Sequence, residues 1–375
     1  MHTRLFLLLV LFRFTAALGQ IGVSLESESG FSSNAYANFA ALPDYHSTFN
    51  AGITRDWLSE KNGLRLFYDG SYTAFKTHGD RDNHSHTLGA AGYTLLGERQ
   101  HRLDAGVNVG KRFHRSSYQL YEQEQLQLYG SLKYLLQPRW FLYTGGSWNL
   151  RRFPELAPFS HSRMLLYGRS SWFFATGTTF IAEADWLQKS YTGSTQPEQA
   201  NYTEVVTVGT GKSQQLLLLL RAAQGITPGI GLSAECQLRH NLTSSTRYLR
   251  NLEDFYFTDE ELFEDHFAYH GAAVLFTYRH TLPWAMRLTF SSRREERNFD
   301  DRQAADLLGE PFPDGRLRQD QRTLLTLEWQ KSVRMRAEGM PLLLTINFSW
   351  LNNHSNDLYY NYTSHYAGVN LAWGW

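Results

Sequence analysis

The chain has 375 residues, and its 36 basic side chains balance its 36 acidic side chains. A net charge of zero favours no polyanionic partner, so we expect no nucleic-acid binding. Hydrophobic residues make up 42% of the chain and aromatic residues 15%, and the single cysteine, Cys236, excludes an internal disulfide bond.

The first 19 residues have the composition of a secretory signal peptide. Arg4 supplies the positive start, residues 5–12 supply the apolar centre, and small residues follow at its end. Arg13 interrupts the apolar run too early for a helix that spans a bilayer. We therefore expect cleavage before Gln20, with residues 20–375 forming a single domain.

Beyond this segment the main signal is alternation of apolar and polar residues with a period of two. In residues 340–352, for example, Leu342, Leu344 and Ile346 share one face and polar residues share the other. Such alternation indicates β-strands with one apolar face. The alternating segments are longer than the five or six residues, roughly, of a soluble sandwich strand, and they match the roughly 9–11 residues that a tilted strand needs to cross hydrocarbon.

The alternation predicts sixteen strands separated by long and short connectors in turn. The expected strands are residues 21–29, 46–59, 63–76, 86–96, 101–114, 120–136, 139–152, 162–175, 178–191, 202–224, 229–241, 267–281, 284–297, 319–335, 340–352 and 364–375. Backbone groups in lipid must be paired, so strands of this kind can only close into a barrel. We predict an all-β fold, a closed antiparallel up-and-down transmembrane β-barrel with long extracellular loops and short periplasmic turns.

One segment offers a competing interpretation, because Gly209 to Ser213 reads Gly-Thr-Gly-Lys-Ser and resembles part of a phosphate-binding loop. Val206 stands where such a loop needs its first glycine, and no helical period follows Ser213. A turn at Lys212 would also move every later long loop to the periplasmic side. We therefore predict one over-long strand over residues 202–224.

The last residues of the chain carry a family resemblance. Val369, Leu371, Trp373 and Trp375 alternate with small or polar residues up to the terminal aromatic residue. This pattern resembles the C-terminal strand of bacterial outer-membrane β-barrel proteins. The resemblance implies a bacterial outer-membrane location, lipid contact around the barrel, and recognition of the last strand by the barrel-assembly machinery.

The tryptophans agree with this interpretation, because they fall near the expected ends of the strands, where indole rings prefer the headgroup level. The expected interface residues are Trp57, Trp140, Trp148, Trp172, Trp186, Trp284, Trp350, Trp373 and Trp375. A β-propeller is the main rival fold, but no repeat of roughly 40–50 residues is visible.

The inward faces of the expected strands carry charges of both signs. The lumen-lining candidates are Arg65, Asp69, Asp104, Arg112, Glu183, Asp185, Glu235, Arg239, Arg287 and Glu328. A sixteen-stranded wall is wide enough for an aqueous lumen, and mixed signs argue against strong ion selectivity. Any one of these residues can equally belong to a structural ladder between neighbouring strands.

Two expected loops combine acidic and apolar residues. In residues 242–266, Thr258 and Glu261 have the spacing of a capping box for a short helix. In residues 298–318, Asp300 or Asp301 could cap a helix that ends at Gly309. We expect these loops to fold over or into the mouth and narrow it, with plain surface loops as the alternative.

Signals for a metal site or for catalysis are weak. The segment with Asp80, Asp82, His84 and His86 has metal-binding residue types without the closed spacing of a zinc site, so we expect no metal and no cofactor. His240 and the serines that follow at residues 244–245 match no catalytic motif. We expect no enzymatic activity.

Taken together, the sequence favours an outer-membrane channel for the passive passage of small hydrophilic solutes. Two alternatives stay open, a plugged barrel with a structural, adhesion or secretion-support role and, less favoured, an outer-membrane enzyme. Transport of hydrophobic solutes would need an apolar lumen, which the polar inward faces do not provide.

Overall fold

The computed structural model describes residues 19–98, 101–193, 204–209, 211–250, 265–333 and 341–374. The expected signal peptide, apart from Gly19, lies outside these residues. So do the capping box at Thr258 and Glu261 and the terminal Trp375. Within the described part of the chain, no helix has the length and apolarity needed to cross a membrane.

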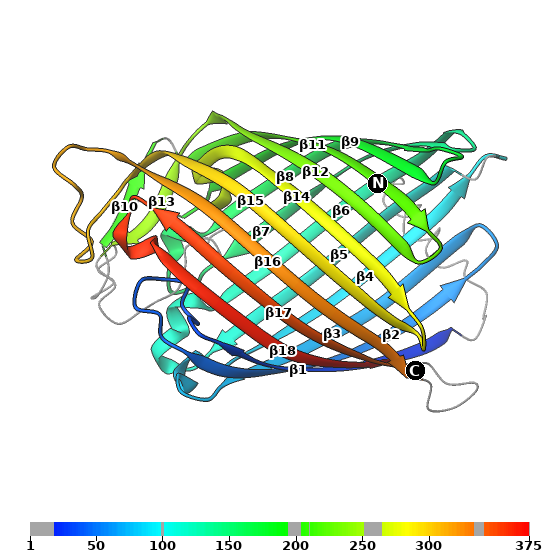
Figure 1. The fold of residues 1–375 in the computed structure, drawn as a ribbon, viewed down its shortest axis with the longest axis horizontal. Helices are drawn as coiled ribbons and strands as arrows, with labels where there is room; N and C mark the ends of the chain where they lie inside the picture. The colour runs from blue at the N-terminus through cyan, green and yellow to red at the C-terminus, as the bar shows by residue number, and fades with distance from the viewer. Residues whose placement is uncertain are drawn as a thin grey trace, which may run out of the picture.

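The protein is a closed antiparallel barrel of sixteen strands (Figure 1). Its strands are β1 (Gln20–Ser32), β2 (Asp44–Leu58), β3 (Asn62–Phe75), β4 (Asn83–Leu96), β5 (His101–His114), β6 (Gln123–Gln137), β7 (Trp140–Arg152), β8 (His161–Phe173), β9 (Thr178–Tyr191), β11 (Lys212–Thr227), β12 (Ile230–Thr243), β14 (Tyr269–Leu282), β15 (Met286–Gln303), β16 (Leu317–Val333), β17 (Leu342–Ser355) and β18 (Tyr362–Gly374). A separate two-stranded sheet pairs β10 (Glu204–Val208) with β13 (Thr246–Arg250). The predicted fold class and strand number are confirmed.

The barrel closes where the first strand pairs with the last, with Ser24 opposite Gly374 and Ser32 opposite Tyr366. Each strand alternates between an outward apolar face and an inward polar face, because successive side chains of a strand point to opposite sides. Outward residues such as Ile21 and Leu88 are about 60% exposed, at 61% and 59%. Large apolar side chains at this exposure around a closed wall form a surface that fits lipid rather than water.

The connections differ between the two ends of the barrel. At one end the turns are short, as between Leu58 and Asn62. The other end holds the long connections, where most of the short helices lie (Figure 1). These are the 3-10 helices η1 (Gly79–Arg81), η2 (Ser116–Tyr121), η3 (Ala157–Phe159), η4 (Asp265–Ala268) and η5 (Leu358–Tyr360). By the usual asymmetry of outer-membrane barrels, the end with long connections faces outward.

The strand expected over residues 202–224 is divided in two, so this prediction is wrong in detail. Gly209 and Gly211 both adopt positive φ, at 87° and 81°, and break the strand between β10 and β11. A Cβ atom at Gly209 would lie 2.9 Å from the carbonyl oxygen of Ser244, so the backbone approaches its neighbour closely there. Lys212 begins a barrel strand rather than a helix, which also removes the phosphate-loop interpretation.

Other boundaries also differ from expectation, and three of them have a local cause. The helix expected after Asp300 or Asp301 is absent, because β15 continues to Gln303. A tight turn follows, in which the Asp306 carboxylate accepts the backbone N–H groups of residues 308 and 310. β6 begins three residues later than expected because η2 occupies the preceding segment, and β15 begins at Met286 because the residue at 284 lies in a turn with positive φ.

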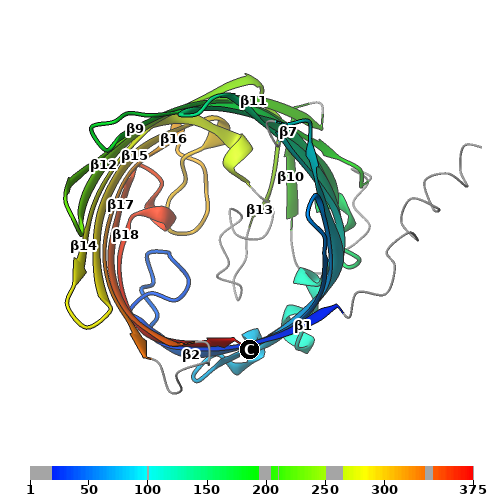
Figure 2. The ribbon, with the colours of Figure 1, turned by 90° about the vertical axis from the view of Figure 1, so that its right-hand side faces the viewer.

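Several long connections fold inward from the outer end. Figure 2, a view along the barrel, shows segments after β1, before β14, between β15 and β16 and between β17 and β18 inside the ring of the wall. Backbone hydrogen bonds join three of them: the N–H of Phe39 donates to the carbonyl oxygen of Tyr359, and that of Leu358 to the carbonyl oxygen of Ala305. These joined segments narrow the outer mouth.

Candidate functional site

A cavity of about 410 Å³ opens on the inner face of the barrel beside η4. Its wall is built from β9, β11, β12, β14, β15 and β16, which are consecutive neighbours in the barrel. The lining residues are Leu187, Gln215, Leu217, Arg239, His266, Tyr269, Arg293, Glu295, Arg297, Arg322 and Leu324. We call this space the lumenal cavity.

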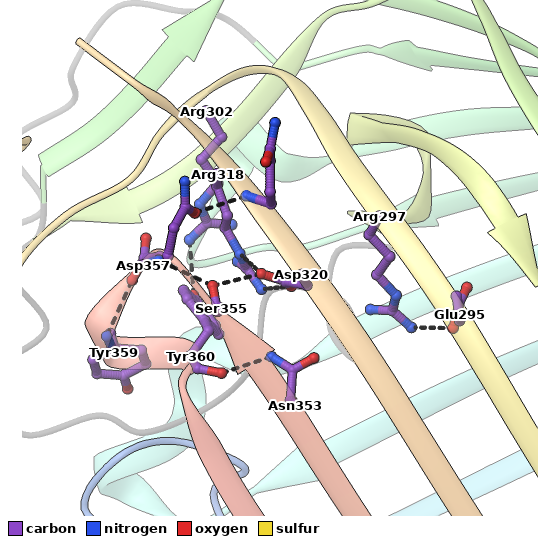
Figure 3. Close-up of polar contacts among 12 residues, drawn as sticks. Glu295, Arg297, Arg302, Arg318, Asp320, Asn353, Ser355, Asp357, Tyr359 and Tyr360 are labelled. Atoms are coloured by element: carbon purple, nitrogen blue, oxygen red, sulfur yellow. Dashed lines mark hydrogen bonds and ion pairs between the residues drawn. The ribbon is translucent and has the colours of Figure 1, made fainter. Parts of the chain in front are cut away.

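The lumenal cavity is strongly basic, with four arginines and one carboxylate among its lining residues. On β15 the residues Arg293, Glu295 and Arg297 are two apart and therefore share the inward face. The Glu295 carboxylate forms an ion pair with Arg297 at 3.0 Å (Figure 3) and lies 3.5 Å from the Arg293 guanidinium. One carboxylate balances one charge, so the lining keeps an excess of positive charge.

The inward position of η4 is fixed by hydrogen bonds to the wall. Arg239 Nη1 donates to the backbone oxygen of His266, at 3.1 Å, and to Gln215 Oε1, at 3.2 Å. Gln215 in turn donates through Nε2 to the backbone oxygens of His266 and Tyr269, both at 3.1 Å. The guanidinium groups of Arg239 and Arg297 lie over the Tyr269 ring at 5.1 and 4.8 Å. These contacts hold the arginines in place beside the cavity.

Three leucines line the lumenal cavity beside the arginines, although they face the lumen. Leu187 and Leu217 lie on β9 and β11 at one edge of the lining, and Leu324 lies on β16 at the other edge. The register explains their position, since Leu217 lies opposite Arg239 and Leu324 lies opposite Arg293. Guanidinium groups next to leucine side chains create a surface that suits an anion with an apolar part.

Next to the cavity, a buried ion pair fastens the outer mouth. The Arg318 guanidinium binds the Asp320 carboxylate at 2.5 Å, and the Ser355 hydroxyl donates to Asp320 at 2.6 Å (Figure 3). Arg318 also lies 3.5 Å from the centre of the Tyr360 ring, and Arg302 Nη2 donates to the Tyr360 hydroxyl at 2.8 Å. We call these five residues the latch, because they tie η5 to β15 and β16.

Asp357, the residue before η5, is a buried acidic residue beside the latch. Its carboxylate accepts the N–H of Tyr359 at 3.1 Å. Burial raises the pKa of the Asp357 carboxyl above its usual range, although Arg318 and Arg302 oppose the change. The loop that carries η5 therefore contains a carboxyl whose ionisation is costly.

The ten lumen candidates all fall on the inward side of the register, and one of them, Arg239, lines the lumenal cavity. Several others form ion pairs with neighbours on the wall: Arg65 with Asp56 at 2.7 Å, Asp104 with Arg102 at 2.7 Å, and Glu183 with Arg169. Asp69, Arg112, Asp185, Glu235, Arg287 and Glu328 lie elsewhere on the same inward face. Contact of any of the ten with a solute stays a prediction.

Three cavity arginines were not among the candidates, namely Arg293, Arg297 and Arg322. Alternation contained the signal for all three, because Arg293 and Arg297 have the parity of the candidate Arg287, and Arg322 has the parity of the candidate Glu328. Arg322 lies opposite Glu295 across β15 and β16, a pairing that depends on register and not on local sequence.

The described tryptophans occupy different heights on the wall. Trp140 and Trp172 face each other across β7 and β8, with ring centroids 6.0 Å apart, and the Trp140 indole N–H donates to Ser170 at 2.7 Å. Trp57 and Trp373 also lie near the end with short turns, while Trp284 lies in a turn and is 78% exposed. Trp148, Trp186 and Trp350 lie nearer the other end of their strands.

The residues considered for metal binding and catalysis are dispersed. Within the described ranges no group of three or more His, Cys, Asp or Glu side chains could hold a metal ion. Asp82 accepts the backbone N–H of Phe75, whereas His86 faces outward. His240 lies on the outward face opposite Leu216, while Ser245 is buried and its hydroxyl accepts the N–H of Gly211.

Solved bacterial outer-membrane channels have the same fold. Pseudomonas aeruginosa OpdK, solved with vanillate, superposes with a TM-score of 0.52 at 9% identity, covering 95% of this chain and 98% of that one. OpdL of the same organism gives 0.51 at 9% identity, covering 96% and 99%, and a variant of OccD1 (OprD) gives 0.52 at 8%, covering 95% of each. No family model and no curated protein matches the sequence. At this identity the likeness shows the fold alone, a sixteen-stranded barrel of the outer-membrane channel type.

Proposed function

We propose that this chain is a bacterial outer-membrane channel through which small hydrophilic solutes pass passively, with a preference for carboxylates that carry an apolar part. The observation that carries the preference is the lining of the lumenal cavity, where four arginines and one carboxylate adjoin three leucines. Arginine binds carboxylates through paired N–H donors, and leucine side chains favour the apolar remainder of the solute.

The fold supports the channel part of this proposal. A wall of sixteen strands is wide enough to enclose water, and the neighbours of the same fold are channels of the outer membrane. OpdK was solved with vanillate, an aromatic carboxylate. A similar solute is a reasonable first probe for this chain.

The mechanism requires no energy source and no chemical step. A solute enters the mouth, meets the excess positive charge of the lumenal cavity, and exchanges water for guanidinium contacts. Partial neutralisation by Glu295 keeps the attraction moderate, which matters because a solute that binds too tightly does not leave.

Planar-bilayer recording tests the proposal directly. We expect ion conductance, a reversal potential in a salt gradient that indicates anion preference, and block of the current by benzoate at lower concentration than by acetate or by uncharged benzyl alcohol. A preference for cations, or equal block by benzyl alcohol and benzoate, would contradict the carboxylate preference.

The plugged barrel is the second candidate, and the inward segments of the outer mouth are what favours it. Folded protein that inserts into bilayers without any conductance or sugar flux would support it. Liposome swelling with small sugars provides an independent measurement of the same point.

A further inference from the structure

An apolar groove crosses the outward face of the barrel, away from the lumen. It has a volume of about 570 Å³ and runs over β17, β18, β1, β2, β3 and β4, which are neighbours in the wall. We call it the outer groove. It is separate from the lumenal cavity, and nothing in the proposed channel function uses it.

Small side chains form the floor of the outer groove. Ala51 lies directly opposite Gly70, and the same row continues to Leu25 on one side and His86 on the other. In the next row Phe49 lies opposite Tyr72, and both rings stand exposed beside the floor. The two small residues in the middle of this row, beside a row of rings, leave a trough that runs across the strands.

The length and direction of the outer groove suit an extended hydrocarbon chain. Six neighbouring strands have five spacings of about 4.8 Å, so the trough is about 24 Å long. Because barrel strands are tilted by roughly 35–45°, a row that crosses them is also oblique to the membrane plane. One end lies at Leu342 of β17, near the short turns, and the other at His86, near the outer end.

The outer end of the groove is polar although it faces away from the lumen. The Tyr68 hydroxyl and His86 Nδ1 are 2.7 Å apart, and His86 Nε2 and His84 Nδ1 are 3.1 Å apart. His84 stacks on the Phe113 ring at 4.8 Å, and the Lys111 ammonium lies 5.0 Å from the centre of the same ring. Polar side chains are costly in hydrocarbon, so this group belongs at headgroup level.

The hydrogen-bond donors of this end suit an anion. They are the imidazole groups of His84 and His86 and the ammonium group of Lys111. Two acids lie beside them: Glu124 binds Lys111 at 3.0 Å, and Asp82 accepts from the Tyr72 hydroxyl at 3.4 Å. Phosphate oxygens accept hydrogen bonds from such donors.

We propose that the outer groove binds a phosphorylated, acylated glycolipid of the outer leaflet, with a phosphate at His84, His86 and Lys111 and one acyl chain over Ala51 and Gly70. The acyl chain replaces bulk lipid along a floor that matches its width, and the phosphate meets the donors at the end of the same trough. This site does not depend on whether the lumen is open or plugged.

The test is lipid retention by the whole protein, extracted from outer membranes in mild detergent and weighed by native mass spectrometry. Two variants alter the site: A51L/G70L fills the floor, and H84A/H86A removes donors at the headgroup end. The control is A184L/G168L, since Gly168 and Ala184 form a directly opposed outward pair on β8 and β9, with open space around Gly168. A Cβ atom at Gly70 meets the end of the Tyr68 side chain at 2.9 Å, which can move aside.

Wild-type protein and control should retain one phosphorylated glycolipid per barrel, and both site variants should retain at least about tenfold less, as 1.4 kcal/mol of lost binding would give. Delipidated protein is then offered a bis-phosphorylated acyl-glucosamine disaccharide, its dephosphorylated form, or phosphatidylglycerol. Preference for the first supports the proposal.

Equal retention by all three variants would overturn the proposal, and so would equal binding of phosphatidylglycerol. A wild-type oligomer that A51L/G70L converts to monomer would assign the groove to a second copy of the chain instead. If A51L/G70L does not reach the folded, heat-modifiable form, H84A/H86A decides the question.

Discussion

Two opposite regions of the lumen wall use charge differently. β5 and β15 lie eight strands apart in the sixteen-stranded ring, so they face each other. On the side of β5, Arg102 pairs with Asp104 at 2.7 Å, and nearby Arg65 pairs with Asp56 at the same distance. On the side of β15, four arginines share a cavity with one carboxylate.

The comparison distinguishes charges that stabilise the wall from charges that can attract a solute. Charges paired one to one neutralise each other locally and leave little field in the lumen. An excess of one sign around a cavity keeps its field and attracts the opposite sign. We therefore expect a solute to be selected on the side of β15, where arginines are in excess, and the side of β5, where charges are paired, provides the control for removing that excess.

We expect the largest effect from removing the excess positive charge of the lumenal cavity. In R293Q/R297Q/R322Q we expect the ratio of anion to cation permeability to fall by at least about tenfold, because three charges a few ångströms from the solute contribute about 1 kcal/mol each even in water. The reversal potential in a salt gradient measures this ratio. The pair removal R65Q/D56N on the opposite side should change it less than about twofold, and an equal change in both variants would refute the comparison.

A smaller effect is expected from the leucines of the lumenal cavity. Leu324→Gln should weaken current block by benzoate about fivefold, a loss of about 1 kcal/mol of apolar contact, and should leave block by acetate unchanged. Leu219→Gln is the matched control, since it has the same chemistry on the inward face of β11 outside the cavity lining. Equal loss for benzoate and acetate would show that Leu324 acts on the shape of the lumen rather than on the ring.

Alternation was sufficient to predict the barrel, because a period of two over long segments leaves few other folds. It placed nearly every strand within a few residues, for example β5 and β9 at their observed bounds. It failed at Gly209 and Gly211, where a local break depends on how the backbone packs against the next connection.

The lumenal cavity was less predictable than the barrel. Parity identifies an inward arginine, but it does not show which strands meet around one space. Arg239 and Arg297 approach the same Tyr269 ring from β12 and β15 because both lie opposite Gly271 of β14, two residues from Tyr269. Such a contact is set by the register of three strands, which residue alternation does not encode.

The latch gives a third way to test the side of β15, through the frequency of current fluctuations. Tyr360→Ala removes the ring beside Arg318 and the hydroxyl that accepts from Arg302, and we expect closures and openings of the current to become about tenfold more frequent. A desolvated guanidinium–ring contact is worth about 2 kcal/mol, which allows a change of that size. Tyr360→Phe keeps the ring and should show a clearly smaller change. Identical traces for Tyr360→Ala and wild type would mean that the η5 loop does not control the mouth.

The smallest expected effect is a pH dependence of the same loop, carried by Asp357. Its pKa is raised in the folded loop, so this carboxyl holds a proton more tightly there than in a released loop. The contribution to loop stability is therefore largest below the ordinary value of 3.8 and is lost as the pH rises through the raised pKa. We expect current fluctuations in wild type to become more frequent as the pH rises through the raised pKa. The variant Asp357→Asn keeps an oxygen acceptor for the Tyr359 N–H and should show a flatter pH dependence.

Because Asp320 and Asp301 remain in both proteins, the difference between the two pH profiles isolates Asp357. A profile in Asp357→Asn as steep as that of wild type would assign the dependence to another carboxyl.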